Sequence, residues 1–167
     1  MNLYLIRHAI AEEEAASGED SQRALTEKGA KKMHLIAKGL RTLGVEFDVI
    51  LTSPYVRAQQ TAEILADVFK MKKKVMVSDQ LTPMGDAELF IAEINEKYAV
   101  DSLAIVGHEP FLSSLAGLLV TGGSSAVEMT FKKGGVCRLA ADDLHHAHRA
   151  TMDWLLTPDL LVELVNR

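Results

Sequence analysis

The sequence predicts an α/β fold built around a largely parallel sheet. Strand-like and helix-like segments alternate along the chain, which is typical of βαβ architecture. Three apolar runs, at 3–6, 49–51 and 103–106, are each followed by a short polar segment, as expected where buried strands end. A length of 167 residues predicts a single domain over 1–167 that can bury a sizeable core.

The first strand is predicted at 2–7 and is followed by a surface loop at 10–25, which is acidic, rich in small residues and without a clear period. Thr26 is a suitable N-cap for the first helix, and Gly44 is a suitable stop. The apolar face of this helix follows helical spacing through Ala30, Met33, Ala37 and Leu40.

The second strand is predicted at 47–52. Ser53 followed by Pro54 is typical of an N-cap with proline in the first turn, which predicts that the second helix begins there. The basic run at 70–74 closes this helix, because cations are favoured near a helix C-terminus, and a short strand follows at 75–77. The apolar face of the second helix comprises Ala58, Ala62, Leu65 and Phe69.

The remaining elements continue the alternation and end in a group of strands. They are a helix at 86–98, a strand at 102–106, a helix at 110–120, two or three strands at about 127–132, 135–141 and 149–156, and a short helix that starts at 157–158.

Composition excludes several classes of protein. A total of 18 Lys and Arg against 23 Asp and Glu gives a net charge of −5, which favours neither a nucleic-acid nor a membrane surface. No apolar run approaches the roughly 20 residues of a membrane span, and the first apolar stretch meets Arg7 too soon for a signal peptide. The lone Cys137 excludes an intrachain disulfide and a thiolate metal cluster. We therefore expect a cytoplasmic protein, and a monomer because no coiled-coil or swapping signal is present.

Histidines and arginines follow three of the predicted strands. Arg7 and His8 end the first, Arg57 lies just beyond the second, and His108 follows the strand at 102–106. Because ligands bind beyond the carboxyl ends of strands in open α/β sheets, we expect these side chains to form one site. The planar set of N–H donors on an arginine guanidinium suits the oxygens of a doubly charged phosphoryl group. Arg57 is also predicted in the first turn of a helix, where free backbone N–H groups attract anions.

This combination indicates phosphoryl chemistry. A histidine with one unprotonated ring nitrogen can attack phosphorus and form a covalent intermediate, and neighbouring arginines keep it neutral. His8, directly after Arg7, is the expected nucleophile. His108 is then the second histidine, which when protonated binds a transferring oxygen and stabilises the transition state.

A metal centre is the competing interpretation of the histidines. His8 and His108 lack the spacing of the helical zinc motif and have no convincing third ligand, so we expect neither a metal nor another cofactor. A second group, His145, His146 and His148, fits a polar hairpin loop, and metal binding there stays open.

Beyond these residues, the chain resembles the histidine phosphatase (phosphoglycerate mutase-like) superfamily. The segments RALTEKG at 23–29 and SPYVRAQQTA at 53–62 are similar to its signatures around the first and second helices. The short length, LTPMGD at 81–86 and WLLTP at 154–158 resemble the SixA-type phosphohistidine phosphatases.

The resemblance implies a three-layer α/β/α sandwich with a mostly parallel sheet and a phosphorylated His8 intermediate. It implies a metal-free phosphate pocket of Arg7, Arg57 and His108, with Arg23 either at the pocket rim or on the surface. Ala9 replaces the glycine of many members. The insertion that carries a glutamate general acid in mutase-like members is absent. Glu109 is the remaining candidate acid, and a first-turn residue favoured by the helix dipole is the alternative.

The missing insertion favours one substrate class. An alkoxide leaving group, by analogy with water of pKa about 15.7, needs a proton supplied, whereas imidazole, with a pKa of about 6.5, demands far less. An open pocket also admits a side chain displayed on a folded protein. We expect a phosphatase that acts on phosphohistidine of a histidine phosphotransfer protein in signal transduction. The alternatives are a small-molecule phosphomonoesterase with the same pocket and a non-catalytic module that binds phosphorylated partners.

Overall fold

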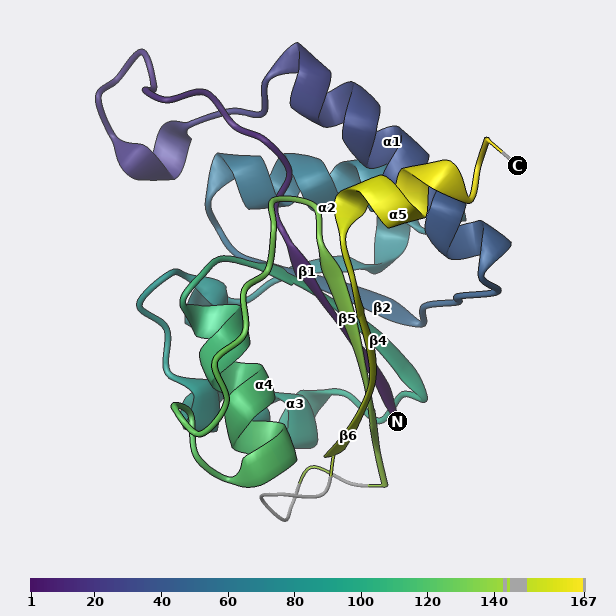
Figure 1. Ribbon diagram of the computed structural model, residues 1–167. Coiled ribbons are helices and arrows are strands. Elements are labelled where there is room, and N and C mark those ends of the chain that lie inside the picture. Colours follow the sequence, from purple (N-terminus) through teal and green to yellow (C-terminus); the bar gives the residue numbers. More distant parts are fainter. Residues whose placement is uncertain (143, 145–149, 167) are drawn as a thin grey trace.

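The computed structural model describes residues 1–142, 144 and 150–166, and it has a six-stranded sheet at its centre (Figure 1). The strand order is β3-β2-β4-β1-β5-β6; the first four strands are mutually parallel, β5 runs antiparallel to β1, and β6 runs antiparallel to β5. The strands are β1 (Asn2–Arg7), β2 (Val49–Thr52), β3 (Val75–Val77), β4 (Ser102–Gly107), β5 (Val136–Ala141) and β6 (Ala150–Leu156). The predicted mostly parallel sheet is confirmed.

Helices cover both faces of this sheet, as Figure 1 shows, which completes the predicted three layers. They are α1 (Glu27–Thr42), α2 (Val56–Phe69), α3 (Ala87–Lys97), α4 (Phe111–Thr121) and α5 (Pro158–Glu163), with short 3-10 turns at Asp20–Gln22, Lys72–Lys74 and Asp79–Leu81. The helices α1, α2 and α5 pack on one face, and α3 and α4 pack on the other. Within the part of the chain described here, every helix is too short or too polar to span a bilayer.

The burial of β1 explains its continuous apolar sequence. Leu3 and Leu5 join the core beneath α3 and α4, whereas Tyr4 and Ile6 join the core beneath α1 and α2. Successive strand side chains point to opposite faces, so a strand covered on both faces must be apolar throughout.

The ends of α1 follow the predicted local chemistry. Thr26 is the N-cap, and its hydroxyl oxygen accepts a hydrogen bond from the backbone N–H of Gly29 at 2.9 Å. Gly44, just beyond the helix, has φ of +73°, a conformation that glycine adopts at little cost.

The predicted start of α2 is wrong. The helix begins at Val56 with Tyr55 at the N-cap position, and Pro54 lies in the turn before it. The Ser53 hydroxyl accepts from the backbone N–H of Tyr55 at 3.3 Å, which lies before the first residue of the helix, and it faces His108. A sequence cannot show that such a side chain has a better partner elsewhere in the fold.

The strand predicted at about 127–132 is also absent. The backbone N–H of Phe131 donates to Glu109 at 2.8 Å, and its carbonyl accepts from Arg7 at 2.6 Å. Side chains of other elements thus satisfy the backbone groups that would have joined a ladder. The strands predicted at 135–141 and 149–156 are present as β5 and β6, although residue 149 and the group His145, His146 and His148 lie outside the described residues.

Candidate active site

Three parallel strands end at one edge of the sheet and bring the candidate residues together. Arg7 of β1 is paired with Gly107 of β4, and Thr52 of β2 is paired with Val106 of β4. The next residue of each chain segment therefore emerges at the same place. These residues are His8, Ser53 and His108, which are 5%, 0% and 1% exposed.

Hydrogen bonding determines which nitrogen of His8 carries a proton. Its Nδ1 lies 2.8 Å from the carbonyl oxygen of Ala9, which can only accept, so Nδ1 must be the donor. The other nitrogen, Nε2, keeps its lone pair and accepts from Arg57 Nε at 3.3 Å. His8 thus presents an unprotonated nitrogen to the arginine, which is the state that a nucleophile requires.

The surroundings keep both histidines neutral. Burial, together with the nearby charges of Arg57 and Arg7, lowers the pKa of His8 to about 4. Burial likewise lowers the pKa of His108 to about 3, helped by His8 and Arg57. The arginines therefore act in the predicted direction, although burial is the larger cause. At neutral pH this lowered pKa favours a neutral His108, whereas the sequence led us to expect a protonated ring.

His108 has one partnered and one unpartnered nitrogen. Its Nε2 lies 2.8 Å from the Ser53 hydroxyl oxygen, whereas the buried Nδ1 has no hydrogen-bond partner among the described residues. The ring lies between two others, with centroid distances of 4.9 Å to His8 and 5.0 Å to Tyr55.

Arg7 also leaves a buried donor free. Its guanidinium donates to the carbonyl of Phe131, and burial lowers its pKa, but its Nε has no partner in the described part of the chain. Buried polar groups are nearly always paired in folded proteins. Two unpaired nitrogens beside the neutral His8, one of them on a guanidinium, suit an anion with several oxygens.

Arg57 is held by the acidic loop that precedes α1. Its two terminal nitrogens donate to the backbone oxygen of Asp20 at 2.6 Å and to the Asp20 carboxylate at 2.9 Å. Its guanidinium also lies 5.0 Å from the centre of the Tyr55 ring. The buried arginine is thereby fixed with its Nε toward His8.

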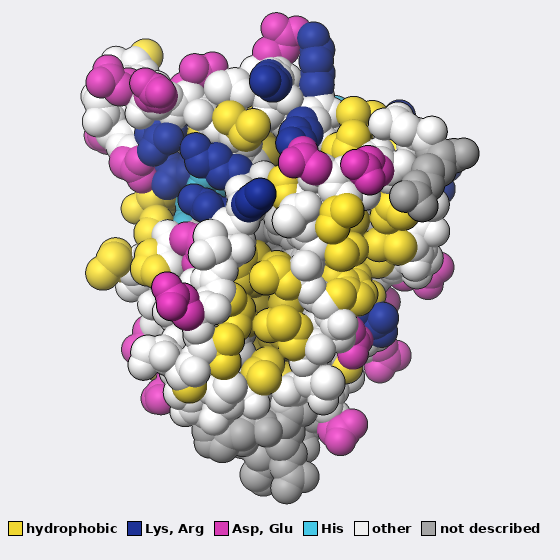
Figure 2. Space-filling view, viewed as in Figure 1, with side chains coloured by type: hydrophobic (Ala, Val, Ile, Leu, Met, Phe, Trp, Pro, Cys, Tyr) yellow, Lys and Arg dark blue, Asp and Glu magenta, His cyan; other side chains and the backbone are white. Residues whose placement is uncertain are grey.

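Arg23 is linked to Arg57 through the Asp20 carboxylate. It donates to the Asp20 carboxylate at 2.7 Å and to the backbone oxygen of Glu12 at 2.7 Å. Hydrogen bonds from Arg23 and Arg57 lower the pKa of Asp20, so this carboxylate is ionised. In Figure 2 Lys and Arg side chains gather beside the visible His surface, below acidic side chains that project at the upper left.

Glu109 points its carboxylate at the backbone. One oxygen accepts from the N–H of Phe131 at 2.8 Å, and the other accepts from the N–H of Ser113 at 3.2 Å and from the Ser113 hydroxyl. The side chain thus joins the segment around Phe131 to the first turn of α4, and none of its hydrogen bonds reaches His8, His108 or Arg57.

Two residues of the site, Asp20 and Thr61, were not identified from the sequence. Asp20 lies in a loop without periodicity, so nothing in the sequence indicated that it faces Arg57. The sequence did hold a signal for Thr61, because it follows Arg57 by one helical turn and therefore lies on the same face of α2. Its hydroxyl donates to the Arg57 carbonyl at 2.7 Å and accepts from the N–H of Ala9 at 3.1 Å, which joins α2 to the residue after His8.

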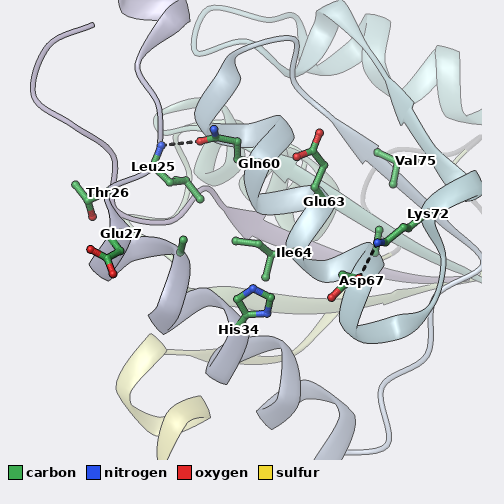
Figure 3. Close-up of a pocket in the computed structure, with 12 residues that line it drawn as sticks. Leu25, Thr26, Glu27, His34, Gln60, Glu63, Ile64, Asp67, Lys72 and Val75 are labelled. Carbon is green, nitrogen blue, oxygen red and sulfur yellow. Dashed lines mark hydrogen bonds and ion pairs between the residues drawn. The ribbon is translucent and has the colours of Figure 1, made fainter.

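A groove lies between α1 and α2, and neither His8 nor His108 lines it (Figure 3). It has a volume of about 710 Å³, and its polar side chains largely pair with each other or with backbone, as in Lys72 with Asp67 at 2.8 Å and Gln60 with the N–H of Leu25 at 2.7 Å. In the described ranges, no group of three or more His, Cys, Asp or Glu side chains is arranged to hold a metal ion.

The buried neutral histidines predict acid sensitivity. The folded pKa values of His8 and His108 are about 4 and about 3, whereas an unfolded chain has the ordinary histidine pKa of about 6.5. Between these values the unfolded chain binds protons that the folded chain does not, so stability is full above about pH 6.5 and falls as the pH falls through this window.

Urea unfolding at pH 7.5 and at pH 5 measures this effect. The free energy of unfolding is expected to decrease more in the parent protein than in a His108→Gln variant, which lacks one of the two groups. Equal decreases in both proteins would show that His108 does not contribute.

Comparisons with known proteins agree with this geometry. The sequence model of the histidine phosphatase superfamily (branch 1) matches residues 3–88. An uncharacterized protein of Picosynechococcus sp. is 37% identical over 160 residues, with 94% of this chain and 96% of the relative covered. Phosphohistidine phosphatase SixA of Escherichia coli is 30% identical, with 95% of this chain and 94% of the relative covered. The structure of the protein histidine phosphatase SixA complexed with tungstate superposes with a TM-score of 0.85 and 28% identity, over 96% of this chain and 99% of that one.

Proposed function

This chain belongs to the histidine phosphatase superfamily (branch 1), and on that premise we propose that it hydrolyses phosphohistidine on a protein of the histidine phosphotransfer type. The observation that carries the proposal is the state of His8. Its proton is held on Nδ1 by a backbone carbonyl, and its free Nε2 faces Arg57 beside two buried unpaired nitrogens.

In the first step the lone pair of His8 Nε2 attacks the phosphorus, and the P–N bond to the substrate imidazole breaks. When the second nitrogen of the substrate ring carries a proton, the ring takes the bonding pair and leaves as neutral imidazole. No further proton is needed. His8 becomes phosphorylated on Nε2 and keeps its Nδ1 proton on the Ala9 carbonyl.

In the second step a water oxygen attacks the phosphorus of phospho-His8. The P–Nε2 bond breaks, its electron pair returns to His8, and dihydrogen phosphate leaves with both protons of the water. The enzyme thus regains its starting protonation state. The same Nδ1–H···O bond keeps the ring oriented through both steps, so Nε2 is the nitrogen presented each time.

Arg7, Arg57 and His108 hold the transferring phosphoryl group in this scheme. The unpaired Arg7 Nε and His108 Nδ1 bind two of its oxygens, and Arg57 turns its Nε from His8 Nε2 to an oxygen once the P–N bond forms. Donors that are positioned before the reaction stabilise the developing charge without reorganisation.

The carboxylates near the site favour an imidazole leaving group. Glu109 is occupied by hydrogen bonds from Phe131 and Ser113, and Asp20 is held ionised by Arg23 and Arg57. Neither is placed to protonate an alkoxide, whereas the proton balance of phosphohistidine requires no such acid. We assign Glu109 a positioning role for the Phe131 carbonyl that binds Arg7. The relatives' name, phosphohistidine phosphatase SixA, supports the same substrate class.

The test is turnover of a phosphohistidine-bearing phosphotransfer protein by the purified chain in the presence of a metal chelator. We expect release of phosphate and, in samples quenched early, acid-labile phosphate on this chain. Glu109→Gln is the matched control, because the amide oxygen can still accept from the N–H of Phe131 and the NH2 group can donate to the Ser113 hydroxyl, but the side chain cannot supply a proton. Little change in that variant is expected.

Two outcomes would replace the proposal. Slow release from the phosphoprotein, together with rapid hydrolysis of a sugar phosphate or another small ester, would assign the pocket to a small-molecule phosphomonoesterase. Saturable binding of the phosphoprotein without turnover of either substrate would assign it to a non-catalytic binding module.

A further inference from the structure

We propose that the Ser53 hydroxyl donates to Nε2 of His108, which holds the proton of that ring on Nδ1 and makes His108 a neutral N–H donor to the phosphoryl group. Ser53 is then a positioning residue that acts through His108. The last part, donation to a phosphoryl group, rests on the proposed function, but the state of the ring can be measured without it.

Ser53 is placed at the end of β2 with few partners. It is completely buried, and its hydroxyl oxygen is 2.8 Å from His108 Nε2 and 3.3 Å from the backbone nitrogen of Tyr55. The Tyr55 N–H can only donate, so it occupies a lone pair of the hydroxyl oxygen. Its proton and its second lone pair are both available to His108 Nε2, so the bond between them could run in either direction.

The two possible directions leave different numbers of buried groups unpaired. If His108 Nε2–H donates to Ser53, the serine proton has no acceptor among the described residues and the Nδ1 lone pair has no donor. If Ser53 donates to Nε2, only the Nδ1–H is unpaired. Each buried unpaired polar group costs about 1–3 kcal/mol, so the second arrangement is favoured.

An anion strengthens this preference. A phosphoryl oxygen accepts from Nδ1–H and completes the hydrogen bonding of the whole Ser53–His108 pair. The opposite tautomer would turn the Nδ1 lone pair toward a negative oxygen, which is repulsive. The tautomer that suits the free protein is therefore also the one that suits the bound anion.

The surroundings of His108 oppose the alternative of a charged ring. His8, Tyr55 and Ser53 enclose it, and the positive charges of Arg57 and Arg7 outweigh the effect of Asp20 on its pKa, which burial and these charges lower to about 3. A neutral N–H donor thus replaces the imidazolium expected from the sequence.

The direct test is nitrogen NMR of the protein labelled with ¹⁵N in its histidines, at pH 7. Nδ1 and Nε2 have distinct shifts in each tautomer, and a His108→Gln variant assigns the signals. The parent protein should show His108 neutral with its proton on Nδ1. A proton on Nε2, or a charged ring, would overturn the proposal.

Ser53 variants separate its hydroxyl from its packing. Ser53→Ala removes the donor and should move His108 toward the Nε2-protonated form, whereas Ser53→Thr keeps a hydroxyl and should preserve the Nδ1-protonated form. An unchanged tautomer in Ser53→Ala would remove the serine from this role. Thermal melting of each variant confirms that it is folded.

Inorganic phosphate is the probe for the second part of the proposal. Its addition should shift the Nδ1–H signal of His108 in the parent protein, and kcat should fall roughly 10-fold or more in Ser53→Ala while Ser53→Thr recovers most of it. A phosphate-insensitive Nδ1 signal would overturn donation to the anion. Failure to hydrolyse phosphohistidine would instead refute the proposed function and leave the tautomer result intact.

Discussion

Replacement of His8 by alanine should reduce phosphatase turnover by on the order of 10⁴-fold or more, because loss of a nucleophile removes the covalent route altogether. The residual arginines would still bind the anion, so KM is expected to change far less than kcat. Acid-labile phosphate on the chain should disappear with the activity.

Rapid-quench experiments with a labelled phosphoprotein measure both effects at once. His34→Ala is the matched control, since His34 lies on α1 at the groove away from the site and its loss should leave turnover unchanged. Turnover by His8→Ala near the parent rate would rule out attack by His8 and direct attention to His108.

Replacement of Arg57 by alanine should lower kcat/KM by roughly 10²- to 10³-fold, the usual effect of losing a preorganised donor at a developing charge. The change also removes the donor to His8 Nε2 and leaves the Asp20 carboxylate without one of its two cationic partners. An anionic substrate then meets a less positive site.

Arg57→Lys distinguishes charge from geometry. An ammonium keeps the charge but cannot join His8, the backbone oxygen of Asp20 and the Asp20 carboxylate as the planar guanidinium does, so we expect only a small recovery. Arg41→Lys, at an exposed arginine near the end of α1, is the control for a general effect of this substitution. Full activity in Arg57→Lys would show that charge alone is needed.

Local sequence signals predicted most of the fold because each depends on near neighbours. The apolar run of β1, the Thr26 cap of α1 and the glycine that follows α1 all act within a few residues. The placement of Arg7, His8, Arg57 and His108 also followed from the sequence, since parallel strands end at the same edge of the sheet.

The errors arose where distant segments compete for one group. Ser53 has the sequence context of a helix cap, yet its hydroxyl faces His108, which is 55 residues away in the chain. The segment 127–132 has the composition of a strand, yet its backbone bonds to Glu109 and Arg7. Local propensity is a weak prior that tertiary contacts readily override.

The sequence by itself thus determined the α/β class, the order of the elements and the four side chains that meet at the strand ends. Only the tertiary structure decided that Asp20 holds Arg57, that burial more than the arginines keeps the histidines neutral, and which nitrogen of His8 is free. The reason is physical. Secondary structure depends on neighbours along the chain, whereas protonation and hydrogen-bond direction depend on every polar group within a few ångströms, whichever element supplies it.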